Sequence, residues 1–186
     1  MLRAEDQIRK LTALTGVMLM ATAEALAQEN AARPARRIVI SIPDRKLAVM
    51  EGDRVVRIFA TAVGAPETPS PTGVYKIVAS ISDPTWYGKG KVIGPGKNNP
   101  VGTRWLGLDL KGYGIHGTNN PASIGHDASH GCVRMRNHDV EELSGMVRIG
   151  DRVELYAGRT PELDRIFGET VVLAESRPQT ALGAAQ

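Results

Sequence analysis

The single cysteine of this 186-residue chain, Cys132, lies in the segment ASHGCVRM at residues 128–135. A histidine, His130, precedes it by two positions, and an arginine, Arg134, follows it by two. In an extended backbone, residues two positions apart face the same way, so an imidazole and a guanidinium would lie beside the thiol. Because such neighbours lower the pKa of a thiol and activate it, the spacing predicts a nucleophilic cysteine.

Gly131 and His116 extend this group of residues. Gly131 directly precedes the cysteine, and a backbone without a side chain can approach an acyl group closely. The N–H groups of Gly131 and Cys132 are therefore a candidate oxyanion hole for a tetrahedral intermediate. His116 lies at the end of a predicted strand in GYGIHGT, within folding reach of the thiol. Together these residue types predict acyl transfer through a thioester.

Two other interpretations of Cys132 stay open. A lone cysteine is frequently a small buried hydrophobic residue, although this one stands among polar residues and glycine rather than in an apolar run. A zinc site is the second interpretation, although the spacings match no zinc signature. The candidate ligands are His116, His126, His130, Cys132 and Asp127. A cysteine nucleophile needs no metal and no cofactor, and it leaves His126 and His138 as surface residues.

Strands and turns are the elements that must position these groups. Runs rich in β-branched residues predict strands at residues 36–42, 46–63 (a hairpin), 74–80, 105–117 and 152–156. Residues 83–104 lack periodicity and predict a long functional loop. A second predicted loop, residues 119–132, ends at the cysteine.

Helical periodicity is limited to the last third of the chain. Val140, Leu143 and Val147 follow the spacing of one helix face, and acidic residues from Asp139 onward suit a helix N-terminus. A short helix is also predicted near residues 161–167. The polar composition after Tyr156 otherwise predicts a C-terminal tail, residues 158–186, that is partly disordered.

The start of the chain predicts export. A basic beginning precedes an apolar stretch, residues 11–23, that is too short to span a bilayer. ALA at residues 25–27 offers a small-x-small cleavage site. Residues 1–27 are therefore predicted to be a signal peptide and residues 28–35 a linker, with an amphipathic first helix as the alternative. The expected location is the periplasm or the cell-wall side of the membrane, where an unpaired thiol needs a role.

Charge and composition give no indication of a nucleic-acid partner or of a membrane-inserted protein. The net charge is +3, and the basic residues are scattered without interleaved aromatic residues, so nothing indicates nucleic acid. No other apolar run is long enough for stable membrane insertion. A hydrophobic content of 42% and a charged content of 23% are ordinary for a globular domain with a core.

Two motifs carry a family resemblance: IHGT at 115–118 and SHGCVRM at 129–135. The pair resembles the signature of the L,D-transpeptidase catalytic domain family, the YkuD type, except that Arg134 stands where other members have asparagine. Further matching segments are TPSPTG at 68–73, DPTW at 83–86, PGKNNPVG at 95–102 and GDRVEL at 150–155. The resemblance covers residues 36–157 and implies a mainly β domain, a sandwich-like arrangement of mixed sheets with one or two short helices.

The resemblance also implies a role for each site residue. Cys132 would be the nucleophile and His116 the general base, oriented by the backbone carbonyl of Gly117. His130 would orient and tune the site, and Gly131 would supply part of the oxyanion hole. Residues 83–104 would form a flap over the cleft. The substrate-binding residues implied are Arg134, Ser129, Trp86 and Tyr113.

The implied substrate is a peptidoglycan stem tetrapeptide. The thiol would attack the carbonyl between the L-centre of a diamino acid and a terminal D-alanine, and release the D-alanine. The thioester would pass to an amine, giving a 3→3 cross-link or attaching another acceptor, such as an outer-membrane lipoprotein or a free D-amino acid. Carbapenems would acylate the same thiol. A hydrolase of the same family, a zinc hydrolase and a non-catalytic wall-binding domain are the alternatives.

Overall fold

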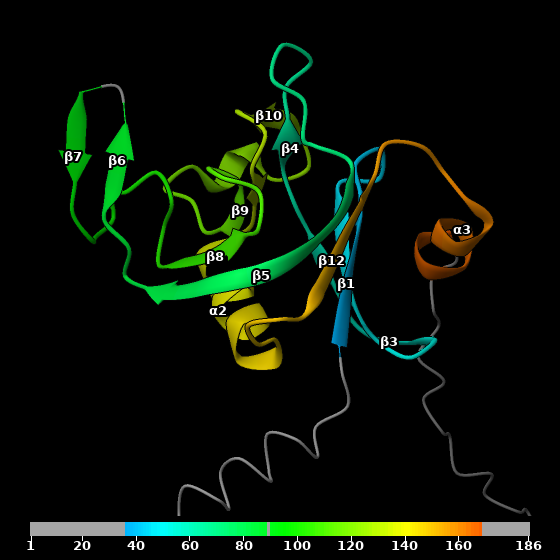
Figure 1. Cartoon of the computed structure of the whole chain (residues 1–186). Helices are drawn as coiled ribbons and strands as arrows, with labels where there is room; N and C mark the ends of the chain where they lie inside the picture. The colour runs from blue at the N-terminus through cyan, green and yellow to red at the C-terminus, as the bar shows by residue number, and fades with distance from the viewer. Residues whose placement is uncertain (1–35, 89, 169–186) are drawn as a thin grey trace, which may run out of the picture.

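The computed structural model describes residues 36–88 and 90–168 (Figure 1). Its main sheet contains β1 (Arg36–Ser41), β2 (Lys46–Glu51), β3 (Arg54–Ala60), β5 (Gly73–Ser82), β8 (Arg104–Leu108), β9 (Gly114–His116), β11 (Val133–Arg134) and β12 (Arg152–Tyr156). Two small sheets pair β4 (Val63–Gly64) with β10 (Asp127–Ser129) and β6 (Trp86–Gly88) with β7 (Lys91–Ile93). The helical segments are η1 (Pro121–Ser123), α2 (Asn137–Met146) and α3 (Pro161–Phe167).

The strand order of the main sheet is β11-β9-β8-β5-β12-β1-β2-β3. Strand β1 is parallel to β12 and antiparallel to β2, so the sheet is mixed. The mainly β fold with a mixed sheet and two short α-helices is therefore confirmed, as is the predicted hairpin, whose arms are β2 and β3. The predicted signal peptide and linker, and the tail beyond residue 168, lie outside the described residues.

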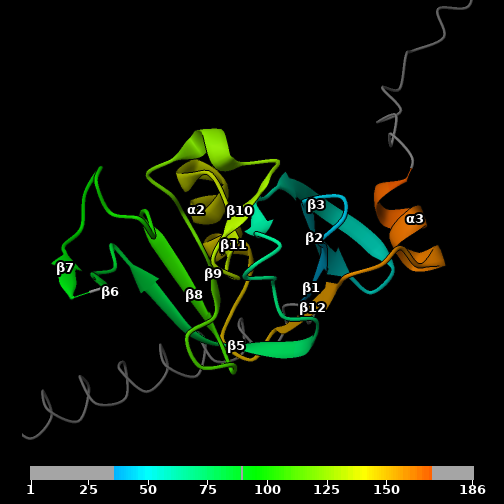
Figure 2. The same ribbon diagram turned by 90° about the horizontal axis from the view of Figure 1, so that it is seen from above.

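The two predicted loops contain more regular structure than the sequence pattern indicates. Residues 83–104 include the β6–β7 hairpin, which Figure 2 shows at one end of the domain. Its two strands have three residues each, and their apolar side chains Tyr87 and Val92 are exposed. The hairpin therefore lacks the alternation of buried apolar and exposed polar residues by which a strand is predicted from sequence. Residues 119–132 include η1 and β10, and β10 pairs in parallel with β4.

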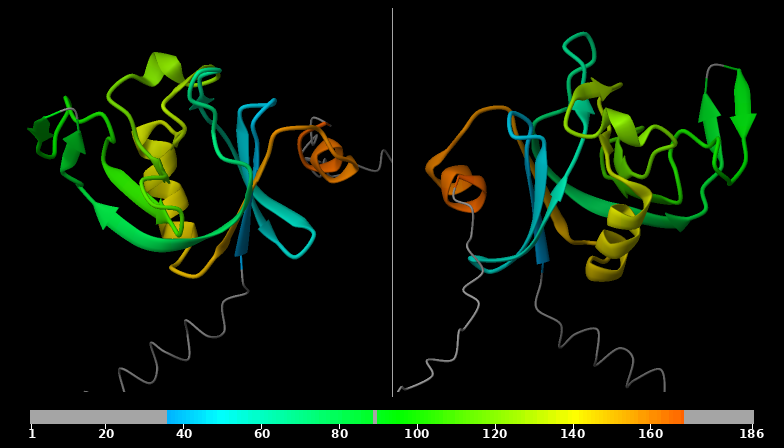
Figure 3. Two further views of the ribbon diagram at one scale, coloured as in Figure 1. Left: turned by 45° about the horizontal axis from the view of Figure 1, so that its top comes forward. Right: turned by 180° about the vertical axis from the view of Figure 1, so that it is seen from behind.

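The sheet is curled, and both of its halves share one core with α2. Val140 and Leu143 of α2 are fully buried in the same cluster as Leu106 from one half of the sheet and Ile38 from the other. The longest strand, β5, crosses between the halves (Figure 3). A register shift between Ile77 and Ala79 interrupts its pairing with β8, and bulges of this kind increase local twist.

Helix α3 covers the opposite face of the sheet. Leu163 and Ile166 are buried against Val39 and Met50, and Figure 3 shows α2 and α3 on opposite sides of β1. Thr160 caps the helix by accepting the Leu163 amide at 3.2 Å, and Pro161 suits its first turn. The predicted helix at residues 161–167 is confirmed. No helix among the described residues is long and apolar enough to cross a bilayer.

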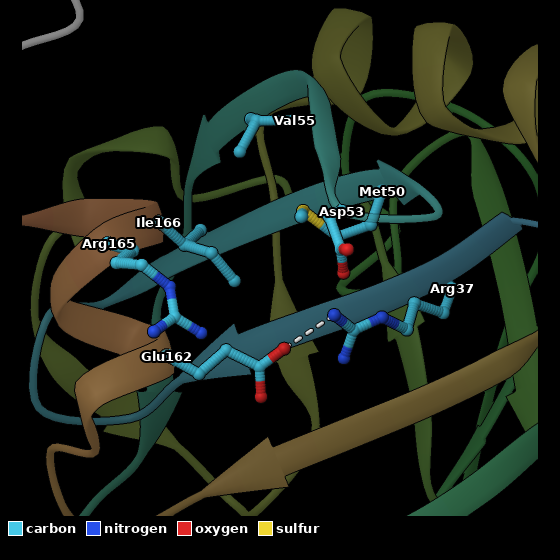
Figure 4. A pocket seen from close by; sticks show the side chains of 7 residues that line it. All are labelled: Arg37, Met50, Asp53, Val55, Glu162, Arg165 and Ile166. Carbon is cyan, nitrogen blue, oxygen red and sulfur yellow. Dashed lines mark hydrogen bonds and ion pairs between the residues drawn. The ribbon is translucent and has the colours of Figure 1, made fainter.

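A cavity of about 380 Å³ lies between α3 and the β2–β3 hairpin (Figure 4). Met50, Val55 and Ile166 contribute apolar walls, and Arg37 pairs with Glu162 at 2.5 Å along one side. Of the residues that the structure describes, neither cysteine nor histidine lines this cavity. The histidines and the cysteine predicted to carry the chemistry therefore lie in a different part of the domain.

Candidate active site

A row of register partners forms the floor of a larger cleft. Ile81 of β5 pairs with Trp105 of β8, Trp105 pairs with His116 of β9, and His116 pairs with Arg134 of β11. Directly paired side chains point to the same face of a sheet, and all four line one cavity of about 750 Å³. Neighbouring positions such as Ile115 point to the other face and are buried in the core with α2.

The cleft brings together most of the residues singled out in the sequence. Six of them line it: Trp86, His116, Ser129, His130, Cys132 and Arg134. Tyr113 lies beside the cysteine loop, where its ring would be 2.8 Å from a Cβ placed on Gly131. His130 is exposed, in contrast to the buried His116. His126 and His138 are also exposed and do not line the cleft.

Cys132 lies on the short connection from β10 to β11, where it is partly buried. Its Sγ donates a long hydrogen bond of 3.6 Å to the carbonyl of Gly112. Burial raises the pKa of the thiol, and a backbone hydrogen bond at Gly114 and the positive charge of Arg134 only partly oppose this effect. The resting cysteine is therefore mainly a thiol, and it needs a base to become a nucleophile.

His116 has the features of such a base. Its Nδ1 lies 2.5 Å from the Gly117 carbonyl, which can only accept a hydrogen bond, so the neutral ring carries its proton on Nδ1 and leaves Nε2 as an acceptor. The ring stacks on Trp105, with centroids 5.5 Å apart. Burial lowers the pKa of His116 to about 4, helped by Arg134 and opposed by Gly117. The imidazole is therefore neutral near pH 7.

Arg134 is the cationic group of the cleft. It is about half buried, burial lowers its pKa, and it has no ion-pair partner among the described residues. Among the described residues, no aspartate or glutamate lines the cleft. A partly desolvated guanidinium in such a cleft favours a ligand that carries a carboxylate.

The loop before the cysteine is held by the Ser129 side chain. Ser129 Oγ donates to the Cys132 carbonyl at 2.5 Å and accepts the Gly131 amide at 3.0 Å. Gly131 has φ +106° and is packed too closely against Tyr113 for a Cβ. The Gly131 amide therefore donates to Ser129 Oγ in this structure, and its part in an oxyanion hole stays a prediction. The Cys132 amide has no hydrogen-bond partner among the described residues.

Asn137, the first residue of α2, is a site residue that the sequence interpretation missed. Its Oδ1 accepts the Thr118 amide at 3.0 Å, beside the Gly117 carbonyl that orients His116. A Cβ on Gly102 would be 2.1 Å from this oxygen, and one on Gly117 would be 2.2 Å from it. The glycines in the two matching motifs were the available signal, since nothing around Asn137 marks it as more than the start of a helix.

The described residues contain no group of three or more His, Cys, Asp or Glu side chains arranged to hold a metal ion. Of the zinc ligands considered from the sequence, Cys132, His116 and His130 line the cleft, whereas His126 and Asp127 do not.

Comparison with known proteins decides the family. The model of the L,D-transpeptidase catalytic domain, YkuD, matches residues 35–155. The chain is a member of the L,D-transpeptidase family. This family consists of cysteine-dependent enzymes that act on peptidoglycan.

Individual L,D-transpeptidase relatives agree with this assignment. The YkuD protein of Bacillus licheniformis is 41% identical over 119 residues, which are 64% of this chain and 64% of that protein. An Enterococcus faecium L,D-transpeptidase of known structure has a TM-score of 0.57 and 26% identity over 66% of this chain and 50% of that one. The L,D-transpeptidase LdtMt1, solved in complex with imipenem, has a TM-score of 0.55 and 21% identity over 66% of this chain and 59% of that one.

Proposed function

We propose that the chain is a cysteine L,D-transpeptidase that acts on peptidoglycan stem tetrapeptides. The observation that carries the proposal is the presence of Cys132 and the neutral, buried His116 in one cleft, at the ends of neighbouring strands. The chain spans 64% of the length of its Bacillus licheniformis relative, and family membership supports the reaction class. The bond attacked is the one between the L-centre of the diamino acid and the terminal D-alanine.

The first half-reaction forms a thioester. Nε2 of His116 takes the proton of the Cys132 thiol as Sγ attacks the carbonyl carbon. The resulting oxyanion is stabilised by the Cys132 amide, and the Gly117 carbonyl stabilises the positive ring through Nδ1–H. The C–N bond then breaks, the proton passes from His116 to the leaving amino group, and D-alanine departs.

The second half-reaction transfers the acyl group to an amine. The acceptor attacks the thioester carbonyl and gives a proton to His116, the C–S bond breaks, and the proton returns to Cys132. An amine on a neighbouring stem gives a 3→3 cross-link, and a lysine of an outer-membrane lipoprotein or a free D-amino acid would give the corresponding conjugate. Water in place of the amine gives hydrolysis.

Arg134 is the proposed anchor for the donor peptide. Its guanidinium lacks a carboxylate partner among the described residues and lies on the cleft floor beside His116. A stem peptide ends in a carboxylate, which matches this charge. Trp86 on the flap side and Trp105 on the floor supply apolar surface for the rest of the peptide. Ser129 and Tyr113 support the cysteine loop, and His130 at the exposed edge is in place to tune the site.

Export fits this function. The basic start, the apolar stretch at residues 11–23 and the ALA at 25–27 support a signal peptide and a periplasmic or wall-side location. Peptidoglycan would be reached only there. The expression of an epitope-tagged full chain, followed by fractionation and N-terminal sequencing of the secreted form, tests this part of the proposal.

A muropeptide assay tests the reaction. Purified protein is incubated with a disaccharide-tetrapeptide and a D-amino acid acceptor, and the products are identified by mass spectrometry. Dimers or acceptor conjugates, together with released D-alanine, are expected. Tripeptide as the only product would show that the protein is a hydrolase rather than a transferase. Recovery of the tetrapeptide and the D-amino acid unchanged would contradict both activities. Cys132→Ala is the inactive control.

A further inference from the structure

We propose that Asn99 is a positioning residue that fixes the flap wall of the cleft and thereby sets substrate affinity. From here on, the name flap refers only to the hairpin part of residues 83–104, that is residues 84–88 and 90–94, which include β6 and β7 and exclude Asn99. Asn99 is fully buried, although asparagine is a polar residue that is mostly exposed in proteins. Its burial requires hydrogen bonds, and the structure supplies them from the flap.

The Asn99 side chain binds both ends of the flap. Its Nδ2 donates to the carbonyl of Pro84 at 2.6 Å, where the chain enters β6. The same nitrogen donates to Gly94 at 3.1 Å, with a longer contact to Ile93 at 3.4 Å, where the chain leaves β7. Its Oδ1 accepts the Val101 amide at 2.9 Å. One amide group therefore closes the base of the hairpin.

The flap depends on this closure because its strands are short and its exposed side chains bury little surface. A two-stranded hairpin is only marginally stable by itself, and each strand here has three residues. Tyr87 and Val92, which pair across the hairpin, are 74% and 68% exposed. The apolar side chains of this pair consequently contribute little burial, and the bonds at the base carry more of the stabilisation.

The position of the flap defines one wall of the cleft. Pro84, Thr85, Trp86 and Tyr87 line the cavity that holds Cys132 and His116. Asn99 also has a hydrogen bond outside the flap, because its backbone carbonyl accepts the Gly102 amide at 3.1 Å. Gly102 in turn packs against Asn137 and Gly117, next to the base. Asn99 thus links the flap wall of the cleft to the segment that orients His116.

Loss of the Asn99 amide is expected to loosen substrate binding more than chemistry, because the flap lines the cleft without supplying the nucleophile or the base. Asn99→Ala removes all four contacts. Asn99→Asp has nearly the same shape and keeps the acceptor for Val101 but loses the donors. Asn98→Ala is the matched control, since the exposed Asn98 contributes only a backbone carbonyl, which Asn119 binds at 3.1 Å.

The test combines hydrogen–deuterium exchange with kinetics on the tetrapeptide; the kinetic part rests on the proposed function. In both Asn99 variants, exchange is expected to rise in residues 84–88 and 90–94 and to stay at the wild-type level in β1, β8 and β9. KM is expected to rise about 10-fold and kcat to change less than about 2-fold, as a loss of uniform binding would produce. Asn98→Ala is expected to match wild type in both measurements.

Four results would overturn the role of Asn99. Unchanged exchange in residues 84–88 and 90–94 would show that other contacts hold the flap, and a fall in kcat at constant KM would place the effect on the chemistry. A uniform rise of exchange, or failure of both variants to fold, would make Asn99 a general stability residue. If wild-type protein does not turn over the tetrapeptide, the proposed function fails, whereas the exchange comparison still decides whether Asn99 holds the flap.

Discussion

His116 and Arg134 are direct register partners on the parallel strands β9 and β11. The His116 carbonyl also accepts the Met135 amide at 2.8 Å, which extends the pairing beyond β11. Cys132 immediately precedes β11, so main-chain hydrogen bonds determine where the nucleophile lies relative to the base. Because these bonds involve no side chain of the site, the relative position of the two strands should survive substitution of either catalytic candidate.

The first prediction concerns the thiol. Cys132→Ala is expected to abolish the covalent adduct with imipenem in intact-mass measurements, because Sγ is the attacking atom. The fold is expected to persist, since the side chain is partly exposed and its contact to Gly112 is long. Wild-type far-UV circular dichroism in the variant is the control. An adduct of the same mass in Cys132→Ala would assign the nucleophile to a different residue.

The second prediction concerns stability in acid. The pKa of His116 is about 4 in the folded protein against an ordinary value of 6.5, so the unfolded chain binds the proton more readily. The contribution of this pKa difference to the free energy of unfolding is fully present above about pH 6.5 and is lost as the pH falls towards 4. Between pH 7 and pH 5 the loss from this group is about 2 kcal/mol.

Urea denaturation at pH 7 and pH 5 measures that loss. His116→Gln is expected to reduce the difference in unfolding free energy between the two pH values by about 2 kcal/mol. His126→Gln, at an exposed histidine, is expected to keep the wild-type difference. Equal pH dependence in wild type and His116→Gln would mean that His116 titrates normally in the folded protein.

The third prediction separates backbone strain from packing in the cysteine loop. Gly131 and Gly125 both have positive φ, +106° and +91°, but only Gly131 is enclosed, by Tyr113 and Pro69. Gly125→Ala is expected to destabilise by about 1–2 kcal/mol from strain alone. Gly131→Ala is expected to lower the free energy of unfolding by about 1–3 kcal/mol more than Gly125→Ala does, and to slow acylation by imipenem. Chemical denaturation compares the two, and equal losses would show that the Tyr113 contact yields without cost.

The fourth prediction concerns Asn137. Asn137→Ala leaves the buried Thr118 amide without an acceptor and is expected to destabilise by about 1–3 kcal/mol. Imipenem acylation is expected to slow at least about 10-fold, because the adjacent Gly117 carbonyl would no longer hold His116 in place.

Asn137→Asp is the conservative counterpart. It keeps an oxygen for Thr118 and adds a negative charge at the start of α2, so stability and acylation are expected to stay near wild type. If the aspartate variant were as slow as the alanine variant, the hydrogen bond to Thr118 would not be the feature that matters.

Much of this architecture is visible in the sequence because it depends on local patterns. The β-branched run at Ile38–Ile40 forms a central strand, and the capping signal at Thr160 and Pro161 begins α3. Cys132 and His116 stand out because few residue types can act as a nucleophile or a base. Neither inference requires knowledge of which segments meet in space.

The supporting contacts could not be predicted in the same way. Asn99 and Asn137 are ordinary polar residues until tertiary contacts give their amides particular partners. The pairing of His116 with Arg134 joins strands separated by a long crossover, and no local pattern specifies such a register. The hydroxyl of Ser129 accepts the Gly131 amide because the turn closes tightly, and no local pattern in the sequence indicates that hydrogen bond.

The burial that raises the pKa of Cys132 also bears on how long the protein survives between turnovers. Peroxides and disulfides react with thiolates, and a sulfur kept protonated reacts with them slowly. The burial that keeps the thiol protonated until a base removes its proton thus also protects it from oxidative damage. Reactivity would appear only when a substrate is in place to be attacked, and the sole sulfhydryl of the chain would remain reduced until then.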